Sequence, residues 1–107
     1  MPIYVSLVNW TEQGIKNFPD TIRRAEEFSR FVQGHGGKVR ESLWTVGEYD
    51  LVQLSEFAND EKAFAAFLRL ESAGNVRTRT MRAFNAKEME AIIHYSTGVR
   101  MEHGSWG

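Results

Sequence analysis

The sequence predicts an α+β fold in which four strands form one antiparallel sheet and two helices cover a single face of it. Two runs rich in β-branched and aromatic residues, 38–46 and 49–57, are separated only by Gly47-Glu48, a spacing typical of a β-hairpin. A strand and an amphipathic helix precede this hairpin, and a second helix and strand follow it. Right-handed crossovers in this split β-α-β order give the sheet order 4-1-3-2.

The first strand is expected at residues 3–10. Both of its alternating faces carry apolar side chains, so we expect it to be covered on both sides, because a half-solvated strand alternates apolar and polar residues. Residues 11–19 are expected to form a loop, since Gly14 and Asn17 interrupt any regular pattern there.

Two amphipathic helices are predicted, at residues 20–33 and 60–72. In each, apolar residues recur every three or four positions, which places them on one side of a helix. Gly34 and the glycines after it end the first helix, and Asn59 is expected to cap the start of the second. The fourth strand follows at residues 76–84.

An extra C-terminal helix is predicted after the last strand, because Asn85-Ala86-Lys87-Glu88 has the spacing of a capping box. The chain then ends in a polar, glycine-rich tail. We therefore divide the sequence into one domain at residues 1–97 and a tail at residues 98–107.

Charged residues support the predicted sheet order, because edge strands tolerate charge that central strands do not. Residues 3–10 and 51–55 carry no charged side chain, whereas the two strands expected at the edges carry Lys38, Arg40, Glu41, Arg77, Arg79 and Arg82. The pattern agrees with a ferredoxin-like βαββαβ sandwich.

Composition excludes several classes of protein. The 107 residues carry a formal net charge of −1, which offers no general attraction to nucleic acid. Cysteine is absent, and this excludes disulfides, thiolate metal sites and cysteine nucleophiles. No run of residues has the length of a membrane span or the pattern of a signal peptide. We expect a cytoplasmic protein with no nucleic-acid or membrane partner.

Several motifs resemble the GYD domain family. They are Gly47-Glu48-Tyr49-Asp50, Gly74-Asn75-Val76-Arg77-Thr78, Arg82-Ala83-Phe84 and Leu7-Val8-Asn9-Trp10-Thr11. The resemblance covers most of the chain before the tail. It implies a ferredoxin-like domain that assembles as a dimeric α/β barrel, so the partner it implies is a second copy of the chain. It implies no function and no catalytic residues.

Gly47, Tyr49 and Asp50 form the turn motif of the predicted hairpin. Gly47 is expected at the first central position of a two-residue type II′ turn, where φ is positive. Tyr49 and Asp50 could act as an acid–base pair, or Asp50 could bind backbone while Tyr49 packs on a neighbour. The second interpretation is favoured, because adjacent strand residues point to opposite faces.

The sheet face that the helices leave open is where we expect a binding site. Alternation along the strands assigns to the helix side Ile3, Val5, Leu7, Val39, Leu43, Val52 and Leu54. It leaves on the open side Tyr4, Ser6, Val8, Trp10, Arg40, Ser42, Trp44, Leu51, Gln53, Ser55 and Phe57. This second set is too apolar to face water, so a second subunit is expected to cover it.

A dimer seam of this kind either has no other role or encloses a small ligand pocket. Buried hydroxyl and amide groups need hydrogen-bond partners, and a small-molecule ligand would supply them. The predicted pocket residues are Tyr4, Ser6, Trp10, Ser42, Trp44, Gln53 and Phe57.

No motif indicates a metal or a cofactor. His94 and His103 lie nine residues apart near the end of a predicted helix, which is not the spacing of a metal-binding pair. The sequence contains no glycine-rich phosphate loop and no nucleophile elbow. We therefore expect neither a metal site nor a bound cofactor.

Three functions remain open, and the sequence does not decide whether the protein is an enzyme. The first is a homo-oligomer that binds a small metabolite in the pocket. The second is a cofactor-independent monooxygenase acting on a small aromatic substrate, which the likeness to other dimeric α/β barrels implies and for which Tyr4, Asn9, Trp10 and Trp44 offer suitable side chains. The third is a structural assembly protein.

Overall fold

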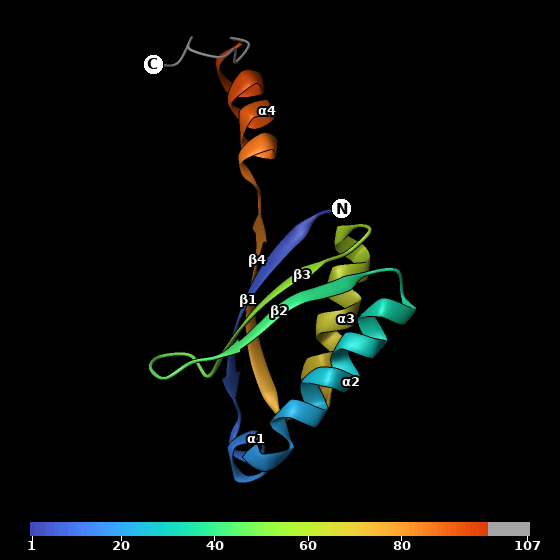
Figure 1. The fold of residues 1–107 in the computed structure, drawn as a ribbon, viewed down its shortest axis with the longest axis vertical. Coiled ribbons are helices and arrows are strands. Elements are labelled where there is room, and N and C mark those ends of the chain that lie inside the picture. Colours follow the sequence, from blue (N-terminus) through green and yellow to red (C-terminus); the bar gives the residue numbers. More distant parts are fainter. Residues whose placement is uncertain (99–107) are drawn as a thin grey trace.

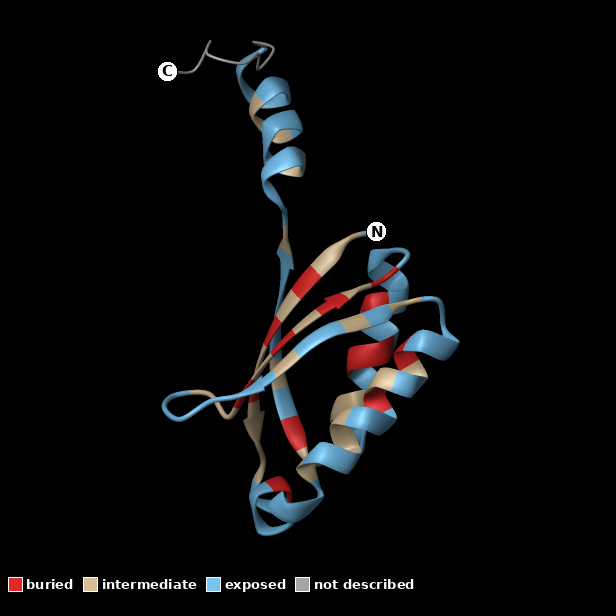
Figure 2. Cartoon of the chain, viewed as in Figure 1, coloured by how far each residue is buried: buried red, intermediate tan, exposed pale blue. Residues whose placement is uncertain are grey.

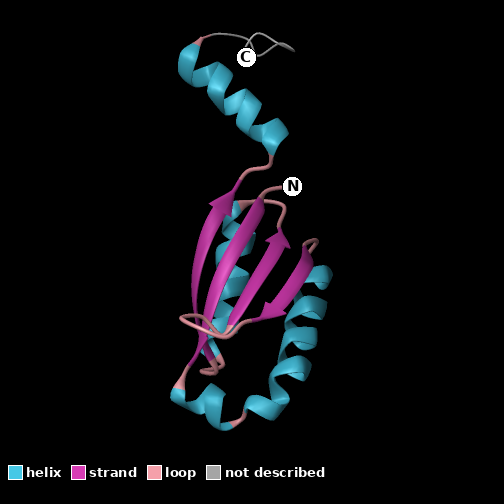
Figure 3. Cartoon of the chain, turned by 60° about the vertical axis from the view of Figure 1, so that its left-hand side comes forward, coloured by secondary structure: helices cyan, strands magenta, loops and turns pink. Residues whose placement is uncertain are grey.

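The computed structural model describes residues 1–98 and confirms the predicted fold (Figure 1). Its elements are β1 (Ile3–Trp10), α1 (Glu12–Lys16), the 3-10 turn η1 (Phe18–Asp20), α2 (Thr21–Gly34), β2 (Lys38–Trp44), β3 (Leu51–Glu56), α3 (Asp60–Ser72), β4 (Val76–Ala83) and α4 (Ala86–Thr97). The strands form one antiparallel sheet in the order β2-β3-β1-β4, which is the predicted order counted from the other edge. Helices α2 and α3 lie together on one face of this sheet (Figure 3).

The predicted assignment of the two sheet faces is wrong. In β1 the buried side chains are those of Tyr4, Ser6 and Val8, and Tyr4 packs in the core with residues of α2 and α3. Buried positions alternate in the same way along β3 (Figure 2), where they are Leu51, Gln53 and Ser55. The side chains that the sequence places on the open face therefore point towards the helices.

The reason lies in the volume between the sheet and the helices. Both faces of β1 are apolar, so alternation alone does not distinguish them. The layer under the helices is filled by large aromatic rings, with Phe57 packed edge-on against Tyr4 and Phe67 at centroid distances of 5.6 and 5.7 Å. Shorter aliphatic side chains such as Val5 and Leu54, which pair with each other, lie on the opposite face.

A bulge in β2 shifts its alternation relative to the rest of the sheet. The register jumps between Val39 and Glu41, so that Arg40 occupies an extra position. Val39 consequently packs against the core under the helices, as the sequence predicts, whereas Leu43 pairs with Val52 on the open face.

Residues 11–19 are not the unstructured loop that the sequence predicts. They contain α1 and the start of η1. The Thr11 side chain accepts a hydrogen bond from the backbone N–H of Gly14 and so caps α1. At five residues this helix is shorter than the window in which hydrophobic periodicity indicates a helix, so Gly14 has the appearance of a helix breaker in the sequence.

The hairpin connection is also longer than predicted, because β2 ends at Trp44 and β3 begins at Leu51. Thr45 N–H donates to the Asp50 carbonyl at 3.0 Å, and the Asn9 amide donates to the Glu48 carbonyl at 2.9 Å. These bonds fix a loop between Trp44 and Leu51. The prediction of a two-residue type II′ turn is therefore wrong. Gly47 nevertheless has a φ of 141°, so its predicted positive φ is confirmed.

Helix α4 extends beyond the end of the sheet (Figure 1). Its predicted capping box is confirmed, because Asn85 Oδ1 accepts from Glu88 N–H at 2.8 Å and Glu88 Oε1 accepts from Asn85 N–H at 2.9 Å. None of the residues of α4 is buried. His103 and the rest of the predicted tail after Gly98 lie outside the described residues. Among the helices of residues 1–98, none has the length and apolar character needed to cross a membrane.

Candidate functional site

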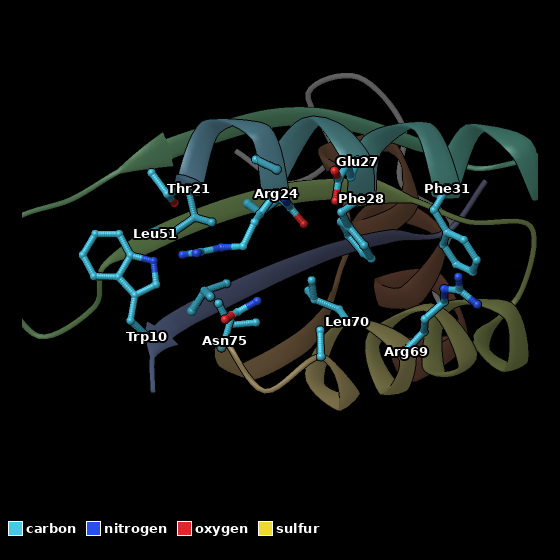
Figure 4. Close-up of a pocket in the computed structure, with 15 residues that line it drawn as sticks. Trp10, Thr21, Arg24, Glu27, Phe28, Phe31, Leu51, Arg69, Leu70 and Asn75 are labelled. Atoms are coloured by element: carbon cyan, nitrogen blue, oxygen red, sulfur yellow. The ribbon is translucent and has the colours of Figure 1, made fainter. Parts of the chain in front are cut away.

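A pocket with a volume of about 250 Å³ lies between α2, α3 and the sheet, and we call it the helix-side pocket. Its apolar surface comes from Val8, Phe28, Leu51, Leu70 and Val76. Trp10 stands at one end, and Phe31 with Arg69 stands at the other (Figure 4). An apolar cleft with a few polar groups is the usual form of a small-molecule site.

Gln53 supplies a buried polar group to this pocket. Its residue is only 3% exposed, and its Nε2 donates to the Ser42 hydroxyl at 3.2 Å. Its amide oxygen, Oε1, has no hydrogen-bond partner in the described part of the chain. A buried acceptor left without a donor costs about 1 to 3 kcal/mol, so a bound molecule that reached this oxygen would gain a hydrogen bond.

Arg24 of α2 brings a guanidinium into the pocket. Nη1 donates to the Asn17 carbonyl at 2.9 Å, and Nη2 donates to the Gly14 carbonyl at 3.3 Å. These two bonds hold the guanidinium over the sheet between Trp10 and Phe28 (Figure 4). The carbonyls satisfy part of its donor set but do not neutralise its charge.

Arg69 of α3 is the second cation in the pocket lining. Its guanidinium carbon lies 4.7 Å from the centre of the Phe31 ring, which is the geometry of a cation–π contact. Glu27 is the acid in the lining, and its Oε1 accepts from Arg23 at 2.8 Å on the outer side of α2. None of the ion pairs within residues 1–98 involves Arg24 or Arg69.

A family model described as GYD domain matches residues 4–93, which include all of the sheet except Ile3 and both helices that form the pocket. The chain belongs to the GYD domain family. The match confirms the family resemblance seen in the sequence motifs. No curated protein and no solved structure matches the chain.

The GYD domain brings only some of the predicted pocket residues together. Trp10 and Gln53 line the helix-side pocket. Ser42 and Trp44 do not line it, but each is hydrogen-bonded to a residue that does. Ser42 accepts from Gln53 Nε2, and the Trp44 indole Nε1 donates to the Thr21 hydroxyl at 3.0 Å. Thr21 lines the pocket directly.

The other three predicted pocket residues have structural partners elsewhere under the helices. Phe57 is 1% exposed in the aromatic core. The Ser6 hydroxyl forms a hydrogen bond with the Thr80 hydroxyl, with 2.9 Å between the two oxygens. The Tyr4 hydroxyl donates to Asp60 Oδ1. Burial, and secondarily this bond to Asp60, raises the pKa of Tyr4 to about 12, so the phenol stays neutral at physiological pH.

Asp50 of the turn motif is hydrogen-bonded to the backbone of Trp10, a residue that lines the pocket. Asp50 Oδ2 accepts a hydrogen bond from the backbone N–H of Trp10 at 2.9 Å, which is a backbone-binding role of the kind expected for this aspartate. Asn9, a residue that an oxygenase pocket would use, instead donates to the Glu48 carbonyl and pairs with Arg77 along the sheet. Asp50 therefore helps to hold Trp10 at the end of the pocket.

Sequence reasoning missed the side chains that the helices contribute. Arg24 lies four residues before Phe28, so both project from the same side of α2. A basic residue on the buried side of an amphipathic helix is a usable signal, because a charge there needs a partner. Groups of three or more histidine and acidic side chains that could hold a metal ion are absent from residues 1–98.

Proposed function

We propose that this GYD domain protein binds a small organic molecule in the helix-side pocket. The observation that carries the proposal is the unpartnered amide oxygen of Gln53, buried at the wall of a cleft of about 250 Å³. A protein that needed Gln53 only for packing would bury an apolar residue there at lower cost. A ligand that donates a hydrogen bond to Oε1 would offset this cost.

The size of the pocket limits the ligand. A water molecule occupies about 30 Å³ in the liquid, so the pocket volume of about 250 Å³ corresponds to a ligand on the order of ten non-hydrogen atoms. The aromatic and aliphatic lining favours a compact ligand with a carbon skeleton. This is the size of a small metabolite and well below that of a dinucleotide.

The first prediction tests occupancy by filling the pocket. Ala25 lines it from α2, and Ala25→Trp should remove binding because the indole would occupy the cleft. Screening the wild type by ¹H–¹⁵N NMR, with fragments that include acids, amides and alcohols, should reveal binders that shift the signals of Gln53 and Leu70. Ala65→Trp, at an exposed position of α3, is the matched control and should keep these shifts. The proposal fails if no fragment shifts these signals, or if Ala25→Trp binds as the wild type does.

We also propose that the protein is a homodimer, or a multiple of dimers, that associates through the open face of the sheet. Alternation opposite the buried positions places on this face Ile3, Val5, Leu7, Leu43, Val52, Leu54 and Met81. Leu43 and Met81 are 52% and 48% exposed in the single chain. A second copy offers a matching apolar surface, as in the dimeric barrel that the family resemblance implies.

The second prediction is therefore a light-scattering mass of about twice the 12.3 kDa of one chain, or a multiple of that dimer mass. Leu43→Glu should shift the protein towards monomers, because it buries a charge in the seam. Leu68→Glu is the matched control, since Leu68 is 56% exposed on α3 and lies on the other side of the sheet. A wild type that stays monomeric at micromolar concentration would contradict this part of the proposal.

A further inference from the structure

We infer that the ligand of the helix-side pocket is a small organic monocarboxylate whose carboxylate binds Arg24 and whose O–H or N–H group donates to Gln53 Oε1. This inference rests on the proposed function and adds the chemical class of the ligand.

Arg24 has donors left for an anion. A guanidinium carries five N–H donors, and the structure pairs two of its nitrogens with the Asn17 and Gly14 carbonyls. The remaining donors include the Nε–H, and the fixed planar fork matches the two oxygens of a carboxylate. Because the two carbonyl bonds already hold the side chain in place, binding an anion would cost little further ordering.

The charges in the lining favour a single negative charge on the ligand. Arg24, Arg69 and Glu27 are the residues of the lining that are charged at neutral pH. Glu27 is already paired with Arg23, and Arg69 lies at the Phe31 end of the pocket, away from Arg24 (Figure 4). An anion at Arg24 therefore meets one guanidinium, whose charge one carboxylate neutralises. A phosphate monoester would bring close to two negative charges to this one cation, so the lining fits a carboxylate better.

Gln53 and the apolar walls define the rest of the ligand. Oε1 is an acceptor only, so the group that meets it must donate, as a hydroxyl or an amide N–H does. Phe28 and Leu70 lie between the Trp10 end and the Phe31 end of the pocket (Figure 4). The ligand body between the carboxylate and the donor is therefore apolar and small.

The test compares two probes of equal size, 4-hydroxybenzoate and its neutral analogue 4-hydroxybenzamide, titrated into the full chain and followed by ¹H–¹⁵N NMR. The wild type should bind the acid about tenfold or more tightly than the amide, since a charge-assisted bond is lost in the amide. Arg24→Met should reduce the affinity for the acid to that for the amide. Arg30→Met, at an exposed position of the same helix that does not line the pocket, should leave both affinities unchanged.

The outcomes separate this inference from the proposed function. If acid and amide bind the wild type equally and Ala25→Trp removes both, the pocket binds small molecules but the carboxylate assignment is wrong. If neither probe shifts the pocket signals and the fragment screen also finds no binder, the proposed function fails as well. The acid-to-amide comparison in the wild type needs no variant, so it tests whether the ligand is a carboxylate even if Arg24→Met does not fold.

Discussion

Replacing Phe57 by alanine is expected to lower the free energy of unfolding by about 3 to 5 kcal/mol. Phe57 is 1% exposed and its ring packs against Tyr4 and Phe67 at centroid distances of 5.6 and 5.7 Å. Truncation would remove the transfer free energy of the ring and leave a cavity between the sheet and α3, which the rigid strands on one side could not close. Urea denaturation followed by circular dichroism, at one fixed protein concentration, measures the change.

Phe64→Ala is the matched control for this prediction. Phe64 lies on α3 as Phe67 does, but it is 67% exposed, so its truncation should change the free energy of unfolding by about 0.5 kcal/mol or less in either direction. Equal effects of the two substitutions would show that the aromatic layer under the helices is not the main core. A large effect of Phe57→Ala alone would support the corrected assignment of the sheet faces.

The order of elements and the sheet topology could be predicted because they depend on local signals. Helix caps such as Asn59 and Asn85 are set by side chain–backbone bonds within a few residues. The charges of the edge strands likewise reflect a simple difference in exposure. The hairpin loop could not be predicted, because Asn9, which is 39 residues away from Glu48, holds it open.

The faces of the sheet could not be predicted because the deciding quantity is volume rather than polarity. The sequence places Ser6 on the open face, yet it is fully buried on the helix side and hydrogen-bonded to Thr80. Trp10 and Gln53 were identified as pocket residues, but the cleft they line lies under the helices. Arg24 projects from the same side of α2 as Phe28, and its guanidinium is held in the cleft by two backbone carbonyls that precede α2, those of Asn17 and Gly14.

Gly14→Ala is expected to destabilise the protein by about 3 kcal/mol, at the upper end of the usual cost of overpacking. A Cβ atom at Gly14 would lie 1.9 Å from the carbonyl oxygen of Asn75. That oxygen cannot easily move, because it accepts a hydrogen bond from Thr11 N–H at 3.0 Å. The substitution should therefore separate α1 from the start of β4, and urea denaturation would report the loss.

Gly34→Ala is the matched control, since a Cβ atom there would meet nothing within 4 Å and Gly34 has no positive φ. It should stabilise the protein by about 0.4 to 1 kcal/mol by restricting the unfolded chain. Gly14→Ala has a second consequence at the pocket, because Asn75 lines it and the Gly14 carbonyl holds Arg24. The affinity for 4-hydroxybenzoate should fall in Gly14→Ala and stay unchanged in Gly34→Ala, and an unchanged affinity in both would mean that this junction does not position Arg24.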